Sequence, residues 1–452
     1  MSKPSRTEIF ENAPVRRAVI SQVVPAVISQ MIALVYNLAD TYFVGLLNDP
    51  SQTAAMTVVY APFLMLTAIS NLSGVGGASA LSRSLGRKNP EEARVISGIS
   101  VWFGLFTALL YSLVFLLFAR PLLAITGARE DTFAPALGYI NWVIVIGGAG
   151  MVMNMLLANL VRAEGSAAKA SFGVSMGGIL NIFLDPIFIL PQFLGLGAKG
   201  AGIATALANL ISALYLLHYI LRSDSTVLSV NPVHLKQTSR FIKEILTVGF
   251  PSAVQYALTV VAVGAQAKFV SKYPTQAVAG LGITKKLDQL PLYFSIGVAN
   301  GLMPLVAYNY SSGNVKRRRD CFWFGTSISI GFALLCVVLY ECFAPVFVSL
   351  FIRDPQTVVY GAAFLRRMVL AMPMMAFCYP MIIQFQAMGK AREALICSVL
   401  RKGVLDIPFL FIMDSLMPLY GCMFVQPIVD TISLVVSLIC YRRIAAKEKV
   451  NI

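Results

Sequence analysis

Long apolar stretches recur along the whole chain and are separated by short polar intervals. Two of them, residues 101–119 and 322–340, contain no charged side chain. An apolar run of roughly 18 residues or more is typical of a helix that spans a lipid bilayer. We therefore predict an all-α integral membrane protein with twelve transmembrane helices, at residues 15–47, 53–82, 95–119, 134–161, 167–191, 200–221, 239–271, 276–308, 321–346, 358–387, 391–415 and 419–441.

The pattern repeats itself once. A proline opens similar segments in the two halves, VVPAVISQ at Pro25 and GFPSAVQY at Pro251, and later segments align Gly86 with Gly313 and Gly165 with Gly389. An even number of helices in each repeat predicts two parallel, pseudo-symmetric units, which is one of the transporter architectures. The predicted domains are an N-terminal six-helix lobe (1–221), a cytoplasmic linker (222–238) and a C-terminal six-helix lobe (239–452).

Composition and charge agree with a membrane protein. The chain is 57% apolar and 13% charged, whereas soluble proteins carry about 25% charged residues. The net charge of +15 does not predict a nucleic-acid partner, because the basic residues form short clusters between apolar runs. The lipid bilayer is the predicted partner, and we expect a monomer without a cleavable signal peptide.

Placement of lysine and arginine predicts the orientation. The termini and the loops on their side hold 26 of them against 6 on the other side, with Lys285, Lys286, Arg366 and Arg367 inside predicted helices. The positive-inside rule then places both termini on the cytoplasmic side of the membrane, which we expect to be a bacterial inner (plasma) membrane. We predict no enzyme, cofactor or metal centre, because the chain has no Walker A motif and His218 and His234 lack carboxylate or cysteine companions.

Carboxylates inside the apolar helices are the candidate functional groups. Placing one at the bilayer centre costs on the order of 3 kcal/mol, so such residues face a cavity or the bundle interior. Five aspartates fall in this class, namely Asp40, Asp185, Asp288, Asp406 and Asp430.

The sharpest candidates lie in the first half of the chain. Helical spacing puts Tyr36, Asn37 and Asp40 on one face, and Asn181 and Asp185 on another. The sixth predicted helix adds Thr205. These oxygen ligands suit a sodium ion, and two close carboxylates also favour holding a proton. The alternative is that the polar groups only join helices together.

Two asparagines of the fourth predicted helix remain alternatives for the same site. Asn154 and Asn159 are five residues apart, so we expect only one to face the cavity. Pro25 interrupts the hydrogen bonding of the first helix and predicts either a static kink or a hinge that responds to the charge of Asp40.

The second half is less acidic at its core. Gln255 and Tyr256 are candidate substrate contacts, and Asp406 lies near the helix-interrupting Pro408. Lys285 and Asp288 are three residues apart and are predicted to form a structural pair. Asp430 is predicted to have a structural role. The sequence assigns no role in ion coupling to the C-terminal lobe.

Ordered motifs along the chain resemble the multidrug and toxic compound extrusion (MATE) transporters, in particular their MepA-like branch. The resemblance rests on Pro25, Met31–Ile32, Tyr36, Asn37 and Asp40–Thr41, followed by LSRSLGRKN (81–89), RAEGSAAKAS (162–171), Asn181 to Pro186, GAGIATALAN (200–209), KLDQLP (286–291) and GLMPLVAYNYSSGN (301–314).

The resemblance implies a V-shaped pair of six-helix lobes that opens alternately to each side of the membrane. It implies export of small organic, often cationic, compounds, driven by inward flow of protons or sodium. The matching ion site is Asp40, Asn181, Asp185 and Thr205 with Tyr36 nearby, and Asn159 resembles its helix-4 asparagine, with Asn154 as the alternative. A flippase for a lipid-linked glycan precursor is the rival within the superfamily, and a non-transporting membrane receptor is a third class.

Overall fold

The computed structural model describes residues 8–270 and 272–450, and these residues contain helices and no strand. Lys3 and Arg6, which were counted with the termini, lie outside the described residues. The N-terminal half contains α1 (Glu8–Glu11), α2 (Val15–Gly45), α3 (Pro50–Gly86), α4 (Pro90–Ile125), α5 (Glu130–Ile140), the π-helical η1 (Asn141–Ile146), α6 (Gly148–Ala163), α7 (Ala167–Ile189) and α8 (Gly197–Arg222).

The C-terminal half follows the short 3₁₀ helix η2 (Pro232–Gln237). It contains α9 (Thr238–Val270), α10 (Thr275–Ser311), α11 (Val315–Ser349), α12 (Pro355–Met368), the 3₁₀ turn η3 (Val369–Ala371), α13 (Met372–Ala387), α14 (Ala391–Val399), the π-helical η4 (Leu400–Val404), α15 (Asp406–Leu416) and α16 (Gly421–Val450).

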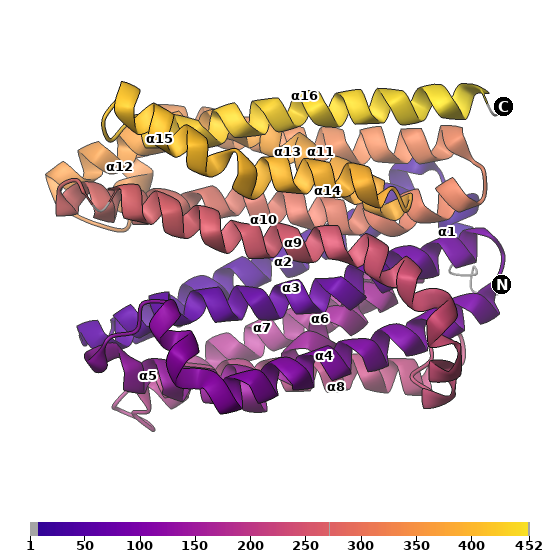
Figure 1. Ribbon diagram of the computed structural model, residues 1–452, viewed down its shortest axis with the longest axis horizontal. Helices are drawn as coiled ribbons and strands as arrows, with labels where there is room; N and C mark the ends of the chain where they lie inside the picture. The colour runs from indigo at the N-terminus through magenta and orange to yellow at the C-terminus, as the bar shows by residue number, and fades with distance from the viewer. Residues whose placement is uncertain (1–7, 271, 451–452) are drawn as a thin grey trace.

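These elements correspond to the twelve predicted crossings. Ten described helices are each long and apolar enough to span a membrane, and the bent pair formed by α5–η1 and α6 makes an eleventh crossing. The remaining predicted crossing is α14–η4–α15, in which Arg401 and Lys402 lie at a break between the two helices. Figure 1 shows the helices of both halves running along the long axis of the molecule. The prediction of a twelve-helix, all-α membrane fold in two lobes is confirmed.

Local sequence explains where several helices begin. Asp49, Asn89, Asn314 and Asp354 each accept a hydrogen bond from a backbone N–H in the first turn of the helix that follows. Such side chains replace partners that the first turn of a helix cannot supply from its own backbone. In three of the four cases a proline comes next. Proline is favourable at the first helical position, because the backbone N–H that it lacks would have no partner within the helix there.

The internal repeat is visible in the backbone as well as in the sequence. In α4, Phe118 has non-helical angles (φ −124°) three residues before Pro121. In α11, Phe343 has nearly the same angles (φ −122°) two residues before Pro345. A proline removes a helical hydrogen bond and bends the helix, so corresponding helices of the two halves are kinked at corresponding places.

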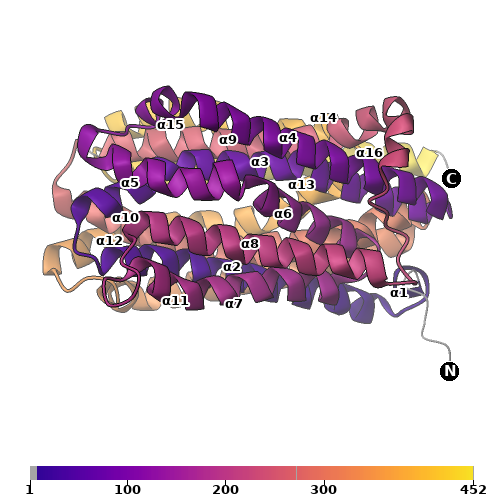
Figure 2. The ribbon, with the colours of Figure 1, turned by 90° about the horizontal axis from the view of Figure 1, so that it is seen from below.

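The two lobes touch mainly near one end of the molecule, where Figures 1 and 2 place α1, the beginning of α2 and the end of α16. We call this the terminal end. There the Ser79 hydroxyl donates to the Gln386 carbonyl (2.7 Å), and Arg83 pairs with Glu244 (2.9 Å). A Cβ added at Gly249 of α9 would lie 1.8 Å from the Leu72 carbonyl oxygen of α3. The lobes are therefore in backbone contact at the terminal end.

Helix α2 also joins the lobes, next to its internal proline. A Cβ at Gly301 of α10 would lie 2.6 Å from the Val23 Cα, and one at Gly297 would lie 2.7 Å from the Val27 Cα. Glycine permits this approach because it has no side chain. Pro25 lies between Val23 and Val27, so it sits within the contact of α2 with the other lobe.

Candidate functional site

The candidate ion site is a chain of buried polar side chains inside the N-terminal half. Helix α2 supplies Asp40, α7 supplies Asn181 and Asp185, and α8 supplies Thr205. The Asn181 amide donates to the Asp185 carboxylate (3.2 Å) and to the Thr205 hydroxyl (3.4 Å). The Thr205 hydroxyl in turn donates to Asp40 (3.4 Å). The four residues chosen from sequence spacing therefore come together from three helices.

The site is buried, and several of its oxygen atoms have no hydrogen-bond partner within the protein. Asp185 is fully buried, and Asp40 is 6% exposed. The two carboxyl groups approach closely enough to interact directly. One oxygen atom of each of Asp40, Asn181 and Asp185 is buried without a hydrogen-bond partner. Buried polar atoms without partners are costly, so these three oxygens suit a bound cation or a shared proton.

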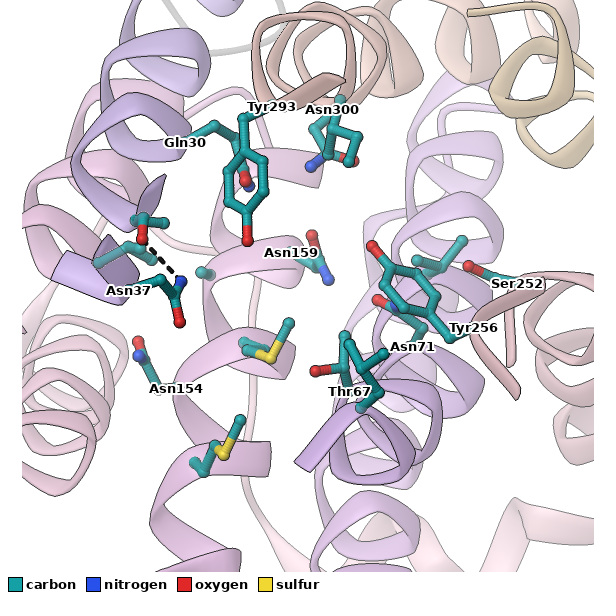
Figure 3. Close-up of a pocket in the computed structure, with 18 of the residues that line it drawn as sticks. Gln30, Asn37, Thr67, Asn71, Asn154, Asn159, Ser252, Tyr256, Tyr293 and Asn300 are labelled. Carbon is teal, nitrogen blue, oxygen red and sulfur yellow. Dashed lines mark hydrogen bonds between the residues drawn. The ribbon is translucent and has the colours of Figure 1, made fainter. Parts of the chain in front are cut away.

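A central cavity of about 260 Å³ lies next to this site, and residues of both halves line it. Figure 3 shows its polar lining, including Asn37 and Asn154 on one side and Asn71, Thr67, Ser252 and Tyr256 on the other. Tyr36, Asn37 and Asn181 belong to the cavity wall, whereas Asp40 and Asp185 do not line it. Asn181 therefore forms the link between the cavity and the acid pair.

Amide and aromatic side chains dominate the cavity wall. Its charged lining residue, among those described, is Arg162, and its aromatic residues include Tyr60, Tyr293 and Tyr379. Such a wall offers apolar and aromatic surface with a few polar groups that orient a ligand, which is typical of sites for small organic molecules. The helix cations Lys285, Lys286, Arg366 and Arg367 are outside the lining.

The two asparagines of the fourth crossing both face the cavity, whereas the sequence analysis expected only one of them to do so. Both Asn154 and Asn159 line it. The Asn154 amide donates to Asn209 (2.9 Å), whose own amide is bound to the Thr205 carbonyl (2.9 Å). Asn159 instead accepts from Arg162 (3.0 Å). The expectation was wrong because it assumed a narrow cavity: both residues lie in the same α-helix, α6, and the cavity is wide enough to take both.

Asn37 and Tyr36 have different surroundings although they are neighbours. The Asn37 amide donates to the Ala33 carbonyl of its own helix (2.7 Å), so it faces the cavity without touching the acids. Tyr36 packs against α7, where a Cβ at Gly178 would lie 3.0 Å from its ring. Sequence spacing grouped them with Asp40 and could not separate these surroundings, and their part in the ion site stays a prediction.

Two residues of the site were missed by the sequence reasoning. Tyr139 of α5 is 4% exposed and its side chain reaches Thr205 beside Asp40. Asn209 of α8 connects Thr205 to Asn154. Asn209 lies four residues after Thr205, so helical periodicity would have found it. Tyr139 lies in a different crossing, and no spacing relates it to the acids.

The candidates of the C-terminal half divide into two groups. Gln255 and Tyr256 line the central cavity, and Gln255 also accepts from Ser398 (3.4 Å). Lys285 and Asp406 instead line a small separate cavity. Asp430 pairs with Arg401 (2.9 Å), whereas Lys285 and Asp288 are only within electrostatic reach of each other. The expected close pairing of Lys285 with Asp288 is therefore replaced by a broader cluster.

Arg401 and Lys402 require a correction. Their placement among the loop residues at the terminal side was wrong, because η4 carries them into the interior of the C-terminal half. Arg401 is 2% exposed and Lys402 donates to Gln426 (2.6 Å). The count of basic residues becomes 24 against 6, so the asymmetry that predicts orientation survives.

Pro25 lies within an unbroken α2, whose described residues all keep helical geometry. The proline sits at the lobe contact, and Asp40 is fifteen residues further along the same helix. The hinge role of Pro25 stays a prediction.

Sequence comparisons define the class of protein. The sequence model of the MatE family matches residues 25–187 and 251–412, once in each half. The chain belongs to this family, the MATE membrane transporters. It is 30% identical over 449 residues to the multidrug export protein MepA of Staphylococcus aureus (strain NCTC 8325 / PS 47), covering 97% of this chain and 96% of that protein. The MepA protein of Staphylococcus haemolyticus (strain JCSC1435) is 28% identical over 423 residues, covering 94% and 92%.

Solved structures show the same fold. An outward-facing multidrug resistance MATE family transporter of the MOP superfamily has a TM-score of 0.91 and 23% identity, with 99% of both chains covered. A crystal structure of MATE in complex with MaL6 has a TM-score of 0.92 and 23% identity, covering 99% of this chain and 100% of that chain. The V-shaped MATE architecture expected from the sequence motifs is thus confirmed.

Proposed function

We propose that this protein is a secondary active multidrug exporter that exchanges small organic, often cationic, compounds for protons or sodium ions. The observation that carries the proposal is the buried Asp40–Asp185 pair, with three unpartnered oxygens, in contact with the wall of a cavity through Asn181. The MepA relatives are multidrug export proteins, which supports the same cargo class here.

Coupling requires that the ion bind two states of the protein with different affinity. In the state described here the lobes meet at the terminal end, and the cavity lies beyond those contacts. A proton or sodium ion at Asp40, Asn181, Asp185 and Thr205 would remove the repulsion between the carboxylates. Bending of α2 near Pro25 would transmit this change, because Pro25 lies within the lobe contact and on the same helix as Asp40.

Orientation completes the proposal. The 24-to-6 distribution of basic residues supports a cytoplasmic terminal end, and bacterial relatives support the inner membrane. The state described here would then be closed to the cytoplasm and outward-facing. We propose a monomer, since the cavity and the acid pair are built from a single chain.

The flippase and receptor alternatives fit the cavity less well. An anionic lipid-linked head group would require a strongly basic cavity, but Lys285, Lys286, Arg366 and Arg367 lie outside its lining. A non-transporting receptor has no need of a cavity of about 260 Å³ beside a pair of buried acids.

Transport by purified protein in proteoliposomes tests the proposal. Export of ethidium, an organic cation, is measured with a proton gradient or a sodium gradient imposed separately. We expect one gradient to drive transport by the wild type, and both Asp40→Asn and Asp185→Asn to lower gradient-driven transport to the level of empty liposomes. Asp49→Asn is the matched control, because Asp49 is a half-buried helix cap outside the site, and asparagine can replace it as a cap. Normal coupled transport by both acid variants would refute the proposed site.

A further inference from the structure

A second cluster of ionisable side chains lies inside the C-terminal half. It contains three cations and three carboxylates within electrostatic reach of one another. Their positions are Lys285 and Asp288 on α10, Arg401 and Lys402 on η4, Asp406 on α15 and Asp430 on α16. The opposite charges balance, which is what burial in a low-dielectric interior requires.

Contacts within the cluster hold these charges in place. Arg401 pairs with Asp430 (2.9 Å), and its guanidinium lies 4.2 Å from the centre of the Tyr379 ring. Lys402 donates to Gln426 (2.6 Å). Tyr379 also lines the central cavity, so the cluster lies directly behind the cavity wall of the C-terminal half.

A small cavity of about 20 Å³ lies within the cluster. Its polar lining residues are Gln266, Lys285, Lys402, Asp406 and Gln426. The volume admits about one water molecule or a small ion. The amide nitrogen of Gln426 is buried there without a hydrogen-bond partner, as are Nη1 of Arg401 and one oxygen of Asp430 deeper in the cluster. The cavity therefore has the size of a site for a small ion, and its lining includes the carboxylate of Asp406 and the amide groups of Gln266 and Gln426, whose oxygens are ligands that hard cations prefer.

The internal repeat relates this cluster to the acid site of the other lobe. The two family matches start at residues 25 and 251 and end at 187 and 412, so corresponding residues differ by 226 and 225. Asp40 then corresponds to Gln266, Asn181 to Asp406 and Asp185 to Leu410. Gln266 and Asp406 both line the small cavity, so this cavity occupies the place of the ion site in its repeat.

A break in the helix brings the cations to this place. Lys402 has non-helical angles, and Gly403 has φ +125°, which is disfavoured for residues with a side chain. The Asp406 carboxylate accepts the freed Gly403 N–H (2.8 Å). The corresponding stretch of α7, around Gly177, stays helical. The break thus directs Lys402 into the small cavity, and the N-terminal lobe has no equivalent side chain.

We propose that the C-terminal lobe retains the ion site of its repeat and fills it with the ammonium group of its own Lys402. The chain itself supplies the positive charge, and Lys285 also lines the cavity, so this lobe needs no coupling ion. The inference rests on the proposed function of the Asp40–Asp185 pair. Removing the Lys402 charge leaves one carboxylate uncompensated, which converts the cavity into a site for a monovalent cation, either a proton or sodium.

The groups that surround Lys402 determine how the opened site titrates. Helix α9 contributes the uncharged Gln266. The charged and titratable groups on the other packed elements are Lys285 and Asp288 of α10, Tyr340 of α11, Cys378 and Tyr379 of α13, Arg401 of η4, Asp406 of α15 and Asp430 of α16.

Thermal unfolding of the purified protein tests the proposal in a background without the N-terminal site. The parent is the Asp40→Asn/Asp185→Asn variant, and its melting temperature is measured against sodium concentration and against pH. We expect Lys402→Met in this parent to gain a sodium-dependent or acid-dependent rise of a few degrees, because a bound ion stabilises the folded state. Adding Asp406→Asn removes this response. Lys286→Met is the matched control, since Lys286 is outside the small cavity, and it leaves the parent's response unchanged.

A second comparison covers the case in which Lys402→Met does not fold. If Lys402 neutralises Asp406, the Lys402→Met/Asp406→Asn variant melts higher than Lys402→Met alone, and Lys402→Arg behaves as the parent. The proposal is overturned if the melting temperature of Lys402→Met depends on sodium and pH in the same way as that of its parent. It is also overturned if Lys402→Met/Asp406→Asn melts no higher than Lys402→Met. Failure of the proposed coupling site is seen separately, as equal ion responses of the wild type and the Asp40→Asn/Asp185→Asn parent.

Discussion

The two lobes share one helical plan but differ in how they bury charge. In the N-terminal lobe, the partners of Asp40 and Asp185 are each other and the neutral Asn181 and Thr205. In the C-terminal lobe, Asp430 is paired with Arg401, and Asp406 shares a cavity with Lys285 and Lys402. A carboxylate pair without a neighbouring positive side chain can bind a proton or a metal cation, whereas carboxylates that are already neutralised by lysine or arginine bind such ions weakly. Two lobes of the same helical plan can therefore differ in whether they bind a coupling ion.

The largest expected effect comes from breaking the charge balance of the C-terminal lobe. Arg401→Met leaves Asp430 buried without its partner, because both side chains are at most 2% exposed. Loss of one partner from a buried ion pair costs about 3–5 kcal/mol. We expect a marked fall in melting temperature, with partial recovery in Arg401→Met/Asp430→Asn. Asp185→Asn should leave the melting temperature unchanged or raise it, since it relieves repulsion. Equal losses in Arg401→Met and Asp185→Asn would contradict the contrast between the lobes.

The next effect concerns the contact between the lobes. Gly249→Ala places a methyl group where the Leu72 carbonyl oxygen lies, at 1.8 Å, and overpacking of this kind costs about 1–3 kcal/mol. The cost falls on the state closed at the terminal end. We expect spin labels at the ends of α3 and α10 to report wider separations, together with slower transport.

Gly264→Ala is the control for this experiment, because it lies on the same helix with open space around it. Its label distances and transport rate should match those of the wild type. A closed distance distribution in Gly249→Ala would show that the contact at Leu72 does not hold the lobes together.

A smaller effect is expected at the ion pair between the lobes. Arg83 is nearly buried and Glu244 is about one-third exposed (8% and 32% for the side chains). Solvent screens such a pair, so Arg83→Gln should shift the balance between closed and open states by about 1 kcal/mol, roughly fivefold. Arg94→Gln is the control, because Arg94 pairs with Glu91 (3.5 Å) on the exposed surface. The same spin-label distance measurement compares Arg83→Gln with Arg94→Gln. Equal changes in the distance distributions of the two variants would show that the Arg83–Glu244 pair does not stabilise the closed state.

The smallest effect concerns features that the lobes share. Asp49 and Asp354 cap α3 and α12, and hydrogen bonds from Ser51 and Thr357 lower their pKa values. A lowered pKa in the folded state gives stabilisation at neutral pH that is lost as the pH falls below the ordinary value near 3.8. Asp49→Ala and Asp354→Ala should each speed amide exchange in the first turn, to a similar extent. At acidic pH the difference from wild type should disappear. A difference that persists would show that the caps are not ionised acceptors.

Much of the fold follows from the sequence because a bilayer imposes simple rules. Apolar length and basic loops located all twelve crossings, including the start of α9 at Thr238 and the end of α13 at Ala387. Four site residues were also predicted, since Asn181 and Asp185 share a helical face and intramembrane acids are rare. Their grouping with Asp40 and Thr205 across three helices was strengthened by the family resemblance.

What the sequence did not reveal depends on backbone irregularity and on contacts between distant crossings. Arg401 and Lys402 were counted with the basic residues of the terminal side, although they fall inside the crossing predicted at residues 391–415. The break at Gly403 that carries them inward cannot be inferred from spacing. The partner of Asp430 was missed for the same reason. Tyr139 and the approach of Gly249 to Leu72 involve helices far apart in the chain, and helical periodicity carries no information about such pairs.

Ion binding by the purified protein and its variants is the most direct test of whether the coupling ion binds in the N-terminal lobe. Release of protons or of sodium ions is measured on addition of ethidium to the wild type, Asp40→Asn, Asp185→Asn and Asp406→Asn. We predict that the response disappears in Asp40→Asn and Asp185→Asn and persists in Asp406→Asn. A response that persists without Asp40 and disappears without Asp406 would place the coupling site in the C-terminal lobe, contrary to this prediction.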